Sequence, residues 1–117
     1  MKISEIVHCL NAALCACEDK SDTNITSACG ADLMSDVLAF SKENAMLLTG
    51  LVNPQVIRTA EMMDMEAVTF VRGKSPTAEM IALAEERGIA LLSTKYPMFT
   101  ACGLLYAEGI IGGVPVS

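Results

Sequence analysis

The chain has 117 residues, 52% of them hydrophobic and 19% charged, and its formal net charge is −6. This length fits one domain with one hydrophobic core, and the apolar content excludes an intrinsically disordered chain. An acidic chain lacks the dominant basic face that nucleic acids and anionic membranes attract, so we expect neither as a partner. No apolar run approaches the roughly 20 residues of a membrane-spanning helix. With no recognisable signal peptide, we predict a cytoplasmic protein.

Hydrophobic periodicity predicts short helices that alternate with short strands. Apolar residues at helical spacing predict an amphipathic helix over 3–10, followed by a short strand at 13–17 and an exposed polar loop at 18–24. Further apolar runs, each followed by a helical pattern, lie at 25–29, 45–49, 67–71 and 89–93. This alternation predicts a single compact α/β domain over 1–117, with a mostly parallel or mixed sheet of four to six short strands flanked by helices.

Prolines and capping residues indicate where the later helices begin. Pro54, Pro76 and Pro97 lie at or near the first helical position, where a missing N–H costs nothing. Asn53 and Ser75 are the predicted N-caps of two of these helices. The apolar stripes expected to cover the sheet are Leu33, Val37 and Phe40; Val56, Ala60 and Met63; Met80, Ile81 and Ala84; and Met98, Cys102 and Leu105.

The C-terminal residues 108–117 are predicted to form an apolar arm. Glycine and proline interrupt the apolar run from Ile110 to Val116, so it is either a short edge strand or an extended arm. An exposed arm on a chain this rich in apolar residues favours a homodimer. We expect the arm or a methionine-bearing helix to contribute to the interface.

The carboxyl ends of the predicted strands form the candidate binding edge. Ligands bind at this edge of open α/β sheets because free N–H groups of loops and helix ends meet there. Arg72, Lys74 and Lys95 lie in two of these loops, in stretches of sequence without acidic residues. The candidate binding residues are Thr49, Gly50, Asn53, Arg72, Gly73, Lys74, Thr94 and Lys95. They predict a site for a small anionic ligand, a phosphate or a nucleotide, although ordinary loop residues are the alternative interpretation.

The sequence contains no recognisable catalytic constellation. His8 is the only histidine, and no serine and acid can be assigned to it as a triad. Neither a Walker loop nor a G-x-G-x-x-G fingerprint is present. Asp32 and Asp36 share a helix face at a spacing of four and are explained as acids of a first helical turn. We therefore expect a non-enzymatic regulatory or ligand-sensing domain, and an accessory component of a phosphotransfer enzyme is the alternative.

The five cysteines have irregular spacing, which is not typical of a disulfide framework. Cys15, Cys17, Cys29 and Cys102 could supply four thiolates to a metal or an iron–sulfur cluster, which makes a thiol-based metal protein the third hypothesis. Cys-x-Cys is not the spacing of common zinc sites, however. Buried cysteines that act as small hydrophobic residues are the preferred interpretation, so no metal and no cofactor is predicted.

Four segments of the chain resemble a known family. They are KISEIV at 2–7, CGADLMSDVLA at 29–39, LLTGL at 47–51 and FVRG at 70–73. Over nearly the whole chain these segments resemble small stand-alone DRTGG-domain proteins, which are similar to segments beside CBS domains in some pyrophosphatases and within some phosphotransacetylases, and distantly to the N-terminal domain of HPr kinase/phosphorylase. The resemblance implies a compact α/β fold, self-association and an accessory or regulatory role without catalytic residues. A protein partner that the sequence does not identify is an open alternative.

Overall fold

A five-stranded sheet lies at the centre of the computed structural model, which describes residues 1–40 and 42–112. Its strands are β1 (Ala13–Ala16), β2 (Ser27–Gly30), β3 (Ala45–Thr49), β4 (Ala67–Phe70) and β5 (Ala90–Ser93). They lie in the order β1-β5-β4-β3-β2. Strands β2 to β5 are parallel, and β1 pairs antiparallel with β5. The predicted compact α/β domain with a mostly parallel or mixed sheet is confirmed.

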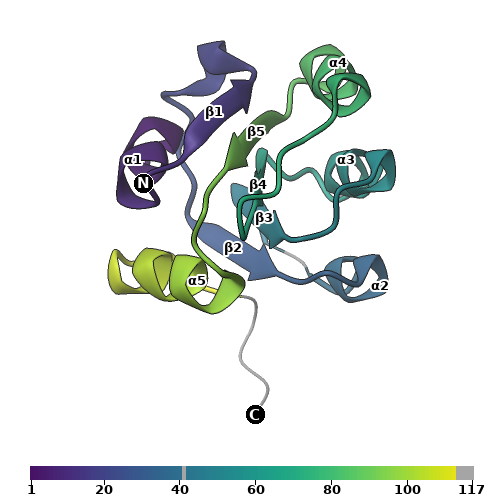
Figure 1. The fold of residues 1–117 in the computed structure, drawn as a ribbon. Helices are drawn as coiled ribbons and strands as arrows, with labels where there is room; N and C mark the ends of the chain where they lie inside the picture. The colour runs from purple at the N-terminus through teal and green to yellow at the C-terminus, as the bar shows by residue number, and fades with distance from the viewer. Residues whose placement is uncertain (41, 113–117) are drawn as a thin grey trace.

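Helices cover both faces of this sheet (Figure 1). On one face lie α1 (Ile3–Cys9) and α5 (Met98–Ala107). On the other face lie α2 (Met34–Val37), α3 (Pro54–Met62) and α4 (Ala78–Arg87). A short 3-10 helix, η1 (Glu18–Lys20), lies within the predicted polar loop. Among the helices of the described residues, none combines the length and the apolar character needed to cross a membrane.

Successive side chains of each strand enter two different hydrophobic clusters. In β3, Met46 and Leu48 pack with residues of α1 and α5, whereas Leu47 packs with residues of α3 and α4. This alternation follows from the strand pleat, which directs neighbouring side chains to opposite faces. All five residues of β3 are buried, as expected for a central parallel strand that is covered on both faces.

One predicted N-cap is confirmed and the other is wrong. The side chain of Asn53 accepts a hydrogen bond from the backbone two residues further on, at 2.8 Å, and caps α3. The N-cap of α4 is Thr77, whose hydroxyl accepts from the backbone at 3.2 Å, and not Ser75. Pro76 disfavours helical backbone at Ser75, the residue before it. The helix is therefore capped by Thr77, the residue after the proline.

The helix after β2 is shorter than the sequence predicts. It is a single turn, so of the predicted stripe only Val37 is fully buried, and Leu33 is 62% exposed. Asp32 lies before this turn, and the prediction that Asp32 and Asp36 share a helix face is therefore wrong. The Asp32 side chain instead accepts hydrogen bonds from Thr49, at the end of β3, and from Gly50.

The described part of the C-terminal arm pairs with the edge strand β2. Ile111 forms a parallel bridge with Ser27, and its carbonyl accepts from the amide of Ala28 at 2.9 Å. Ile110 is buried beneath this contact. The arm therefore satisfies part of a sheet edge that would otherwise expose unpaired N–H and C=O groups. The last residues of the predicted arm, 113–117, lie outside the described residues.

Gly30 allows α5 to pack closely over the end of β2. A Cβ at this position would lie 2.9 Å from Cys102 Sγ and 3.2 Å from Met98 Sδ. Overpacking of this kind typically costs about 1–3 kcal/mol, so we expect Gly30→Ala to lower the free energy of unfolding by about 1 kcal/mol. In a Cys102→Ala background the same substitution should cost less, because the nearest atom is gone. Urea denaturation of the four proteins tests this coupling, and strictly additive effects would contradict it.

Candidate functional site

The parallel strands bring the predicted binding residues to one edge of the sheet. Each of them ends a strand or belongs to the segment between that strand and the following helix: Thr49, Gly50 and Asn53 between β3 and α3; Arg72, Gly73 and Lys74 after β4; and Thr94 and Lys95 after β5. Because β3, β4 and β5 are adjacent and parallel, these three segments are neighbours.

A tight turn after β4 presents Arg72 and Lys74. The backbone φ angles of Arg72 and Gly73 are 58° and 73°, both left-handed. The amide of Lys74 donates to the carbonyl of Val71 at 3.2 Å and closes the turn. Two consecutive left-handed residues closed in this way are typical of a type I′ turn, which explains the glycine at 73. Arg72 and Lys74 are both exposed.

Two main-chain hydrogen bonds, here named the loop clamp, hold this turn against the segment after β5. The amide of Arg72 donates to the carbonyl of Tyr96 at 2.8 Å, and the amide of Gly73 donates to the carbonyl of Thr94 at 2.9 Å. The hydroxyl of Ser93 also donates to the carbonyl of Lys74, at 2.5 Å. The loop clamp therefore fixes the backbone from which the Arg72 side chain extends.

Thr94 supports this clamp from inside the protein. It is 2% exposed, and its hydroxyl donates to the carbonyl of Leu10 at 2.7 Å. The same oxygen accepts from the amide of Tyr96 at 3.3 Å. The hydroxyl is thus buried and hydrogen-bonded within the chain as both donor and acceptor. Thr94, a candidate binding residue in the sequence, therefore contributes to the site by positioning the loop clamp and not by direct contact through its hydroxyl.

Asp32 is the residue of this edge that the sequence analysis missed. Its Oδ1 accepts from the amide of Gly50 at 2.7 Å and from the hydroxyl of Thr49 at 3.2 Å. A signal was present, because an acid lies two residues after β2, and the neighbouring parallel strand ends at Thr49 and is followed by Gly50. The sequence predicts Asp32 only as an acid of a first helical turn, because spacing along the chain does not show the contact with Thr49 and Gly50.

Arg72 and Asp32 both lie close to Gly50. A Cβ on Gly50 would be 3.7 Å from Arg72 Nη2 and 3.5 Å from Asp32 Oδ1. The guanidinium and this carboxylate do not form an ion pair; the salt bridge found within 1–40 and 42–112 joins Arg87 and Glu61 at 3.0 Å. The arrangement places a guanidinium, with several N–H donors, beside a carboxylate that still has acceptor capacity.

Four backbone amides at this edge are not free, which corrects one expectation from the sequence. The amides of Gly50, Arg72, Gly73 and Lys74 all donate to acceptors of the same chain. Turn closure and the loop clamp satisfy them, as native structures require of most backbone groups. The charged groups that remain for an anion at this edge are the exposed side chains of Arg72, Lys74 and Lys95.

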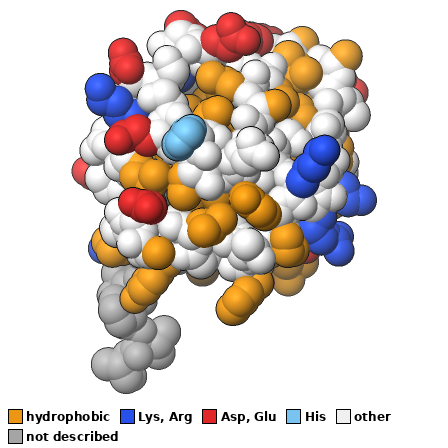
Figure 2. All heavy atoms as spheres, turned by 60° about the vertical axis from the view of Figure 1, so that its left-hand side comes forward, with side chains coloured by type: hydrophobic (Ala, Val, Ile, Leu, Met, Phe, Trp, Pro, Cys, Tyr) orange, Lys and Arg blue, Asp and Glu red, His pale blue; other side chains and the backbone are white. Residues whose placement is uncertain are grey.

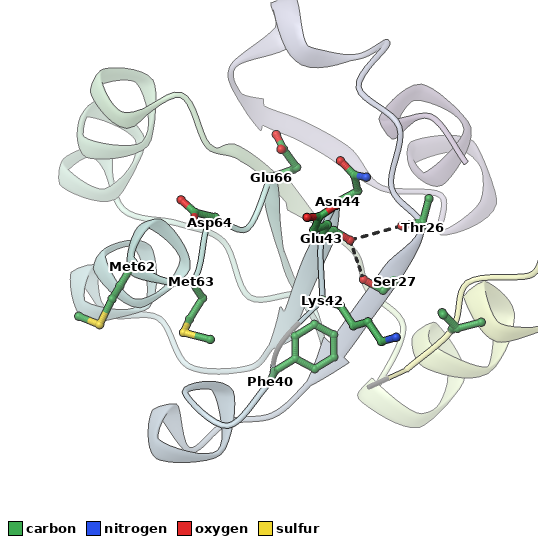
Figure 3. A pocket seen from close by; sticks show the side chains of 11 residues that line it. Thr26, Ser27, Phe40, Lys42, Glu43, Asn44, Met62, Met63, Asp64 and Glu66 are labelled. Atoms are coloured by element: carbon green, nitrogen blue, oxygen red, sulfur yellow. Dashed lines mark hydrogen bonds between the residues drawn. The ribbon is translucent and has the colours of Figure 1, made fainter. Parts of the chain in front are cut away.

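A cavity of about 980 Å³ lies elsewhere, near the amino end of β3 (Figure 3). Its charged lining residues are Lys42, Glu43, Asp64 and Glu66, three acids and one base. The hydroxyls of nearby threonine and serine side chains donate to the Glu43 carbonyl and are not available to a ligand there. This predominantly acidic cavity suits an anion less well than the carboxyl edge, despite its size.

The thiols of the metal hypothesis do not meet at one point. Cys15 lies in β1 and Cys29 in β2, which are opposite edges of the sheet. Cys17 follows β1, and Cys102 belongs to α5. In the described part of the chain, which contains every cysteine, no three His, Cys, Asp or Glu side chains are placed to hold a metal ion. This geometry argues against a four-thiolate centre.

The cysteines are expected to react slowly in the folded protein. Burial raises the pKa of all five thiols. The carboxylate of Glu108 raises the pKa of Cys9 further, and the carboxylate of Glu85 does the same for Cys17. A raised pKa lowers the thiolate fraction at pH 8, and the thiolate is the reactive form. Labelling with Ellman's reagent at pH 8 should therefore be slower for the native protein than for the protein in guanidinium chloride. A cysteine that reacts equally fast in both states would contradict this.

Asp32 is expected to stabilise the segment after β3. Asp32→Ala removes the acceptor of two hydrogen bonds and should lower the free energy of unfolding by about 0.5–1.5 kcal/mol. Asp32→Asn retains an oxygen acceptor and should lose less. Asp36→Ala, which removes an exposed acid of α2, is the matched control for the change in charge. Equal destabilisation by Asp32→Ala and Asp36→Ala in urea would show that the Asp32 contacts are not important.

Comparison with known proteins identifies a structural neighbour. No protein-family model matches the chain, and no curated protein matches it. Among solved structures, the chain is similar to the CBS and DRTGG domains of the regulatory region of a Clostridium perfringens pyrophosphatase, complexed with the activator diadenosine tetraphosphate. The TM-score is 0.73 at 19% identity, and the match covers 89% of this chain and 45% of that chain. The likeness establishes a shared fold, and membership of the DRTGG family stays a prediction.

Proposed function

We propose that this chain is a regulatory, ligand-sensing domain that binds a small anionic ligand, a phosphate or a nucleotide, at the carboxyl edge of its sheet. The observation that carries the proposal is the position of Arg72. The loop clamp fixes its backbone, its side chain is exposed, and its guanidinium lies beside Gly50 without an ion-pair partner. Lys74 and Lys95 add two exposed cations in the same pair of segments.

The side chains at this edge suit a phosphorylated ligand. A guanidinium offers a planar set of N–H donors that matches two phosphate oxygens, and lysines add charge without fixed geometry. The Asp32 carboxylate can still accept hydrogen bonds from the sugar hydroxyl groups of a ligand. A nucleotide carries such hydroxyl groups and inorganic phosphate does not. A nucleotide would therefore use both the cations and the carboxylate of this edge.

The structural neighbour supports a regulatory role. Its fold is shared over most of this chain, and it belongs to the regulatory region of a pyrophosphatase that was solved with a nucleotide activator. A sensing domain of this kind needs no catalytic group of its own, in agreement with the absence of a recognisable triad or Walker loop in the sequence. We place the domain in the cytoplasm and assign it no cofactor.

Titration with phosphate, pyrophosphate and ATP, followed by heteronuclear NMR at low salt, tests the proposed site. We expect the signals of Arg72 Nε–Hε and of residues 72–74 and 95 to shift with ATP or pyrophosphate. Arg72→Ala should weaken the affinity by about 1.5- to 5-fold, since one exposed charge is worth about 0.2–1 kcal/mol. Affinity should also fall as salt is added, because screening weakens exposed charges.

The control for this titration is Arg58→Ala, which removes an exposed arginine from α3 and changes the net charge equally. It should leave the affinity nearly unchanged. An equal loss in both variants would indicate nonspecific attraction to net charge. If no anion at millimolar concentration moves the signals of these residues, the site is wrong and a purely protein-binding domain is the better explanation.

A further inference from the structure

Two aromatic side chains are exposed around the first turn of α5: Tyr96 and Phe99, here named the aromatic pair. Tyr96 is 37% exposed and Phe99 is 89% exposed. The chain has only two tyrosines and three phenylalanines, and such rings normally add their large apolar surface to a core or an interface. Lys95 directly precedes the pair and is also exposed. Figure 2 shows hydrophobic side chains bordering Lys and Arg side chains, at the right of the view. Exposed rings beside cations are complementary to a ligand that is both aromatic and anionic.

The segment that carries Tyr96 follows the carboxyl edge of the sheet. After β5, the carbonyl of Tyr96 accepts a hydrogen bond from the amide of Arg72, in the turn after β4, at 2.8 Å. Met98 then lies at the end of β2, since a Cβ on Gly30 would be 3.2 Å from the Met98 Sδ. Strand β3 lies between β4 and β2 in the sheet. The segment therefore spans the carboxyl ends of the four parallel strands, and Tyr96 lies beside the candidate site.

Arg72 connects the aromatic pair with the carboxylate of Asp32. Its backbone is bonded to Tyr96, and its Nη2 would lie 3.7 Å from a Cβ on Gly50. The Oδ1 of Asp32 would lie 3.5 Å from the same Cβ. An aromatic residue, a guanidinium and a carboxylate thus follow one another along this edge. Aromatic rings stack on bases, guanidinium groups bind phosphates, and carboxylates accept hydrogen bonds from sugar hydroxyls.

We propose that the aromatic pair binds the base of a nucleotide, whose phosphates lie on Arg72 and Lys95 and whose sugar hydroxyls donate to Asp32. This inference rests on the proposed function and selects a nucleotide over inorganic phosphate and pyrophosphate as the ligand. Stacking on an aromatic ring tolerates any base, because every base has a π-face. The site is therefore selective for nucleotides over inorganic anions, and not for one particular base.

NMR titrations with ATP and with inorganic tripolyphosphate, at equal low ionic strength, test the base contact. Both ligands carry three phosphates, and tripolyphosphate has at least as much negative charge, so attraction to cations alone does not favour ATP. The wild-type protein should bind ATP at least about fivefold more tightly, the low end of what one stacked base contributes. The double variant Tyr96→Ala with Phe99→Ala should lose this preference through weaker binding of ATP. Its unchanged affinity for tripolyphosphate would show that the cationic site is still folded.

The matched control is Tyr106→Ala, which removes the other tyrosine, 74% exposed near the far end of α5, and should leave both affinities unchanged. Tyr96→Phe keeps the ring and should keep the preference for ATP. Equal affinity of the wild type for the two ligands overturns the base contact and leaves the proposed anion site in place. A preference that survives in the double variant, or that Tyr106→Ala abolishes equally, overturns the base contact as well. Binding of neither ligand overturns the proposed function itself, and the base contact with it.

Discussion

One buried side chain, Thr94, links the elements on which the candidate site depends. Its hydroxyl donates a hydrogen bond to the carbonyl of Leu10, 84 residues earlier in the chain. Its main-chain carbonyl accepts a hydrogen bond from the amide of Gly73. Thr94 therefore connects the end of α1, the segment after β5 and the turn after β4. Because an unpaired buried polar group is costly, loss of the Leu10 contact would destabilise the buried Thr94 hydroxyl. The position of Arg72 follows from these hydrogen bonds through the loop clamp.

Much of the fold could be predicted because its strands are short, continuous apolar runs. The runs at 45–49, 67–71 and 89–93 coincide with β3, β4 and β5, which are covered on both faces and so leave a strong signal. The direction of β1 could not be predicted, because periodicity within a strand carries no information about its partner. The single turn of α2 was overestimated for a related reason: the spacing of Leu33 and Val37 fits a helical face whether or not the helix reaches Leu33.

The position of the candidate residues at one edge of the sheet could be predicted from the sequence, but not which of their hydrogen-bonding groups remain free. A parallel sheet gathers the residues that follow its strands, and this is why Arg72 and Lys95 could be assigned to one edge from the sequence. Which N–H groups remain free depends on turn closure and on contacts between loops. The amide of Gly73 donates to the carbonyl of Thr94, and the amide of Gly50 donates to Asp32. The two partners of the Asp32 side chain, Thr49 and Gly50, lie 17 and 18 residues further along the chain. The proposed site therefore relies on side chains rather than on these backbone amides.

Amide hydrogen exchange of the ligand-free protein tests most directly whether the amides of the turn after β4 are engaged in the loop clamp. If the loop clamp holds as described, the amides of Arg72 and Gly73 exchange far more slowly than in an unfolded chain, although they lie in an exposed turn. Thr94→Val, which removes the supporting hydroxyl, then accelerates both. Exchange of these two amides at the unfolded rate, with the amides of β4 still protected, would contradict side-chain recognition, because it would leave the backbone of the turn free to bind the anion.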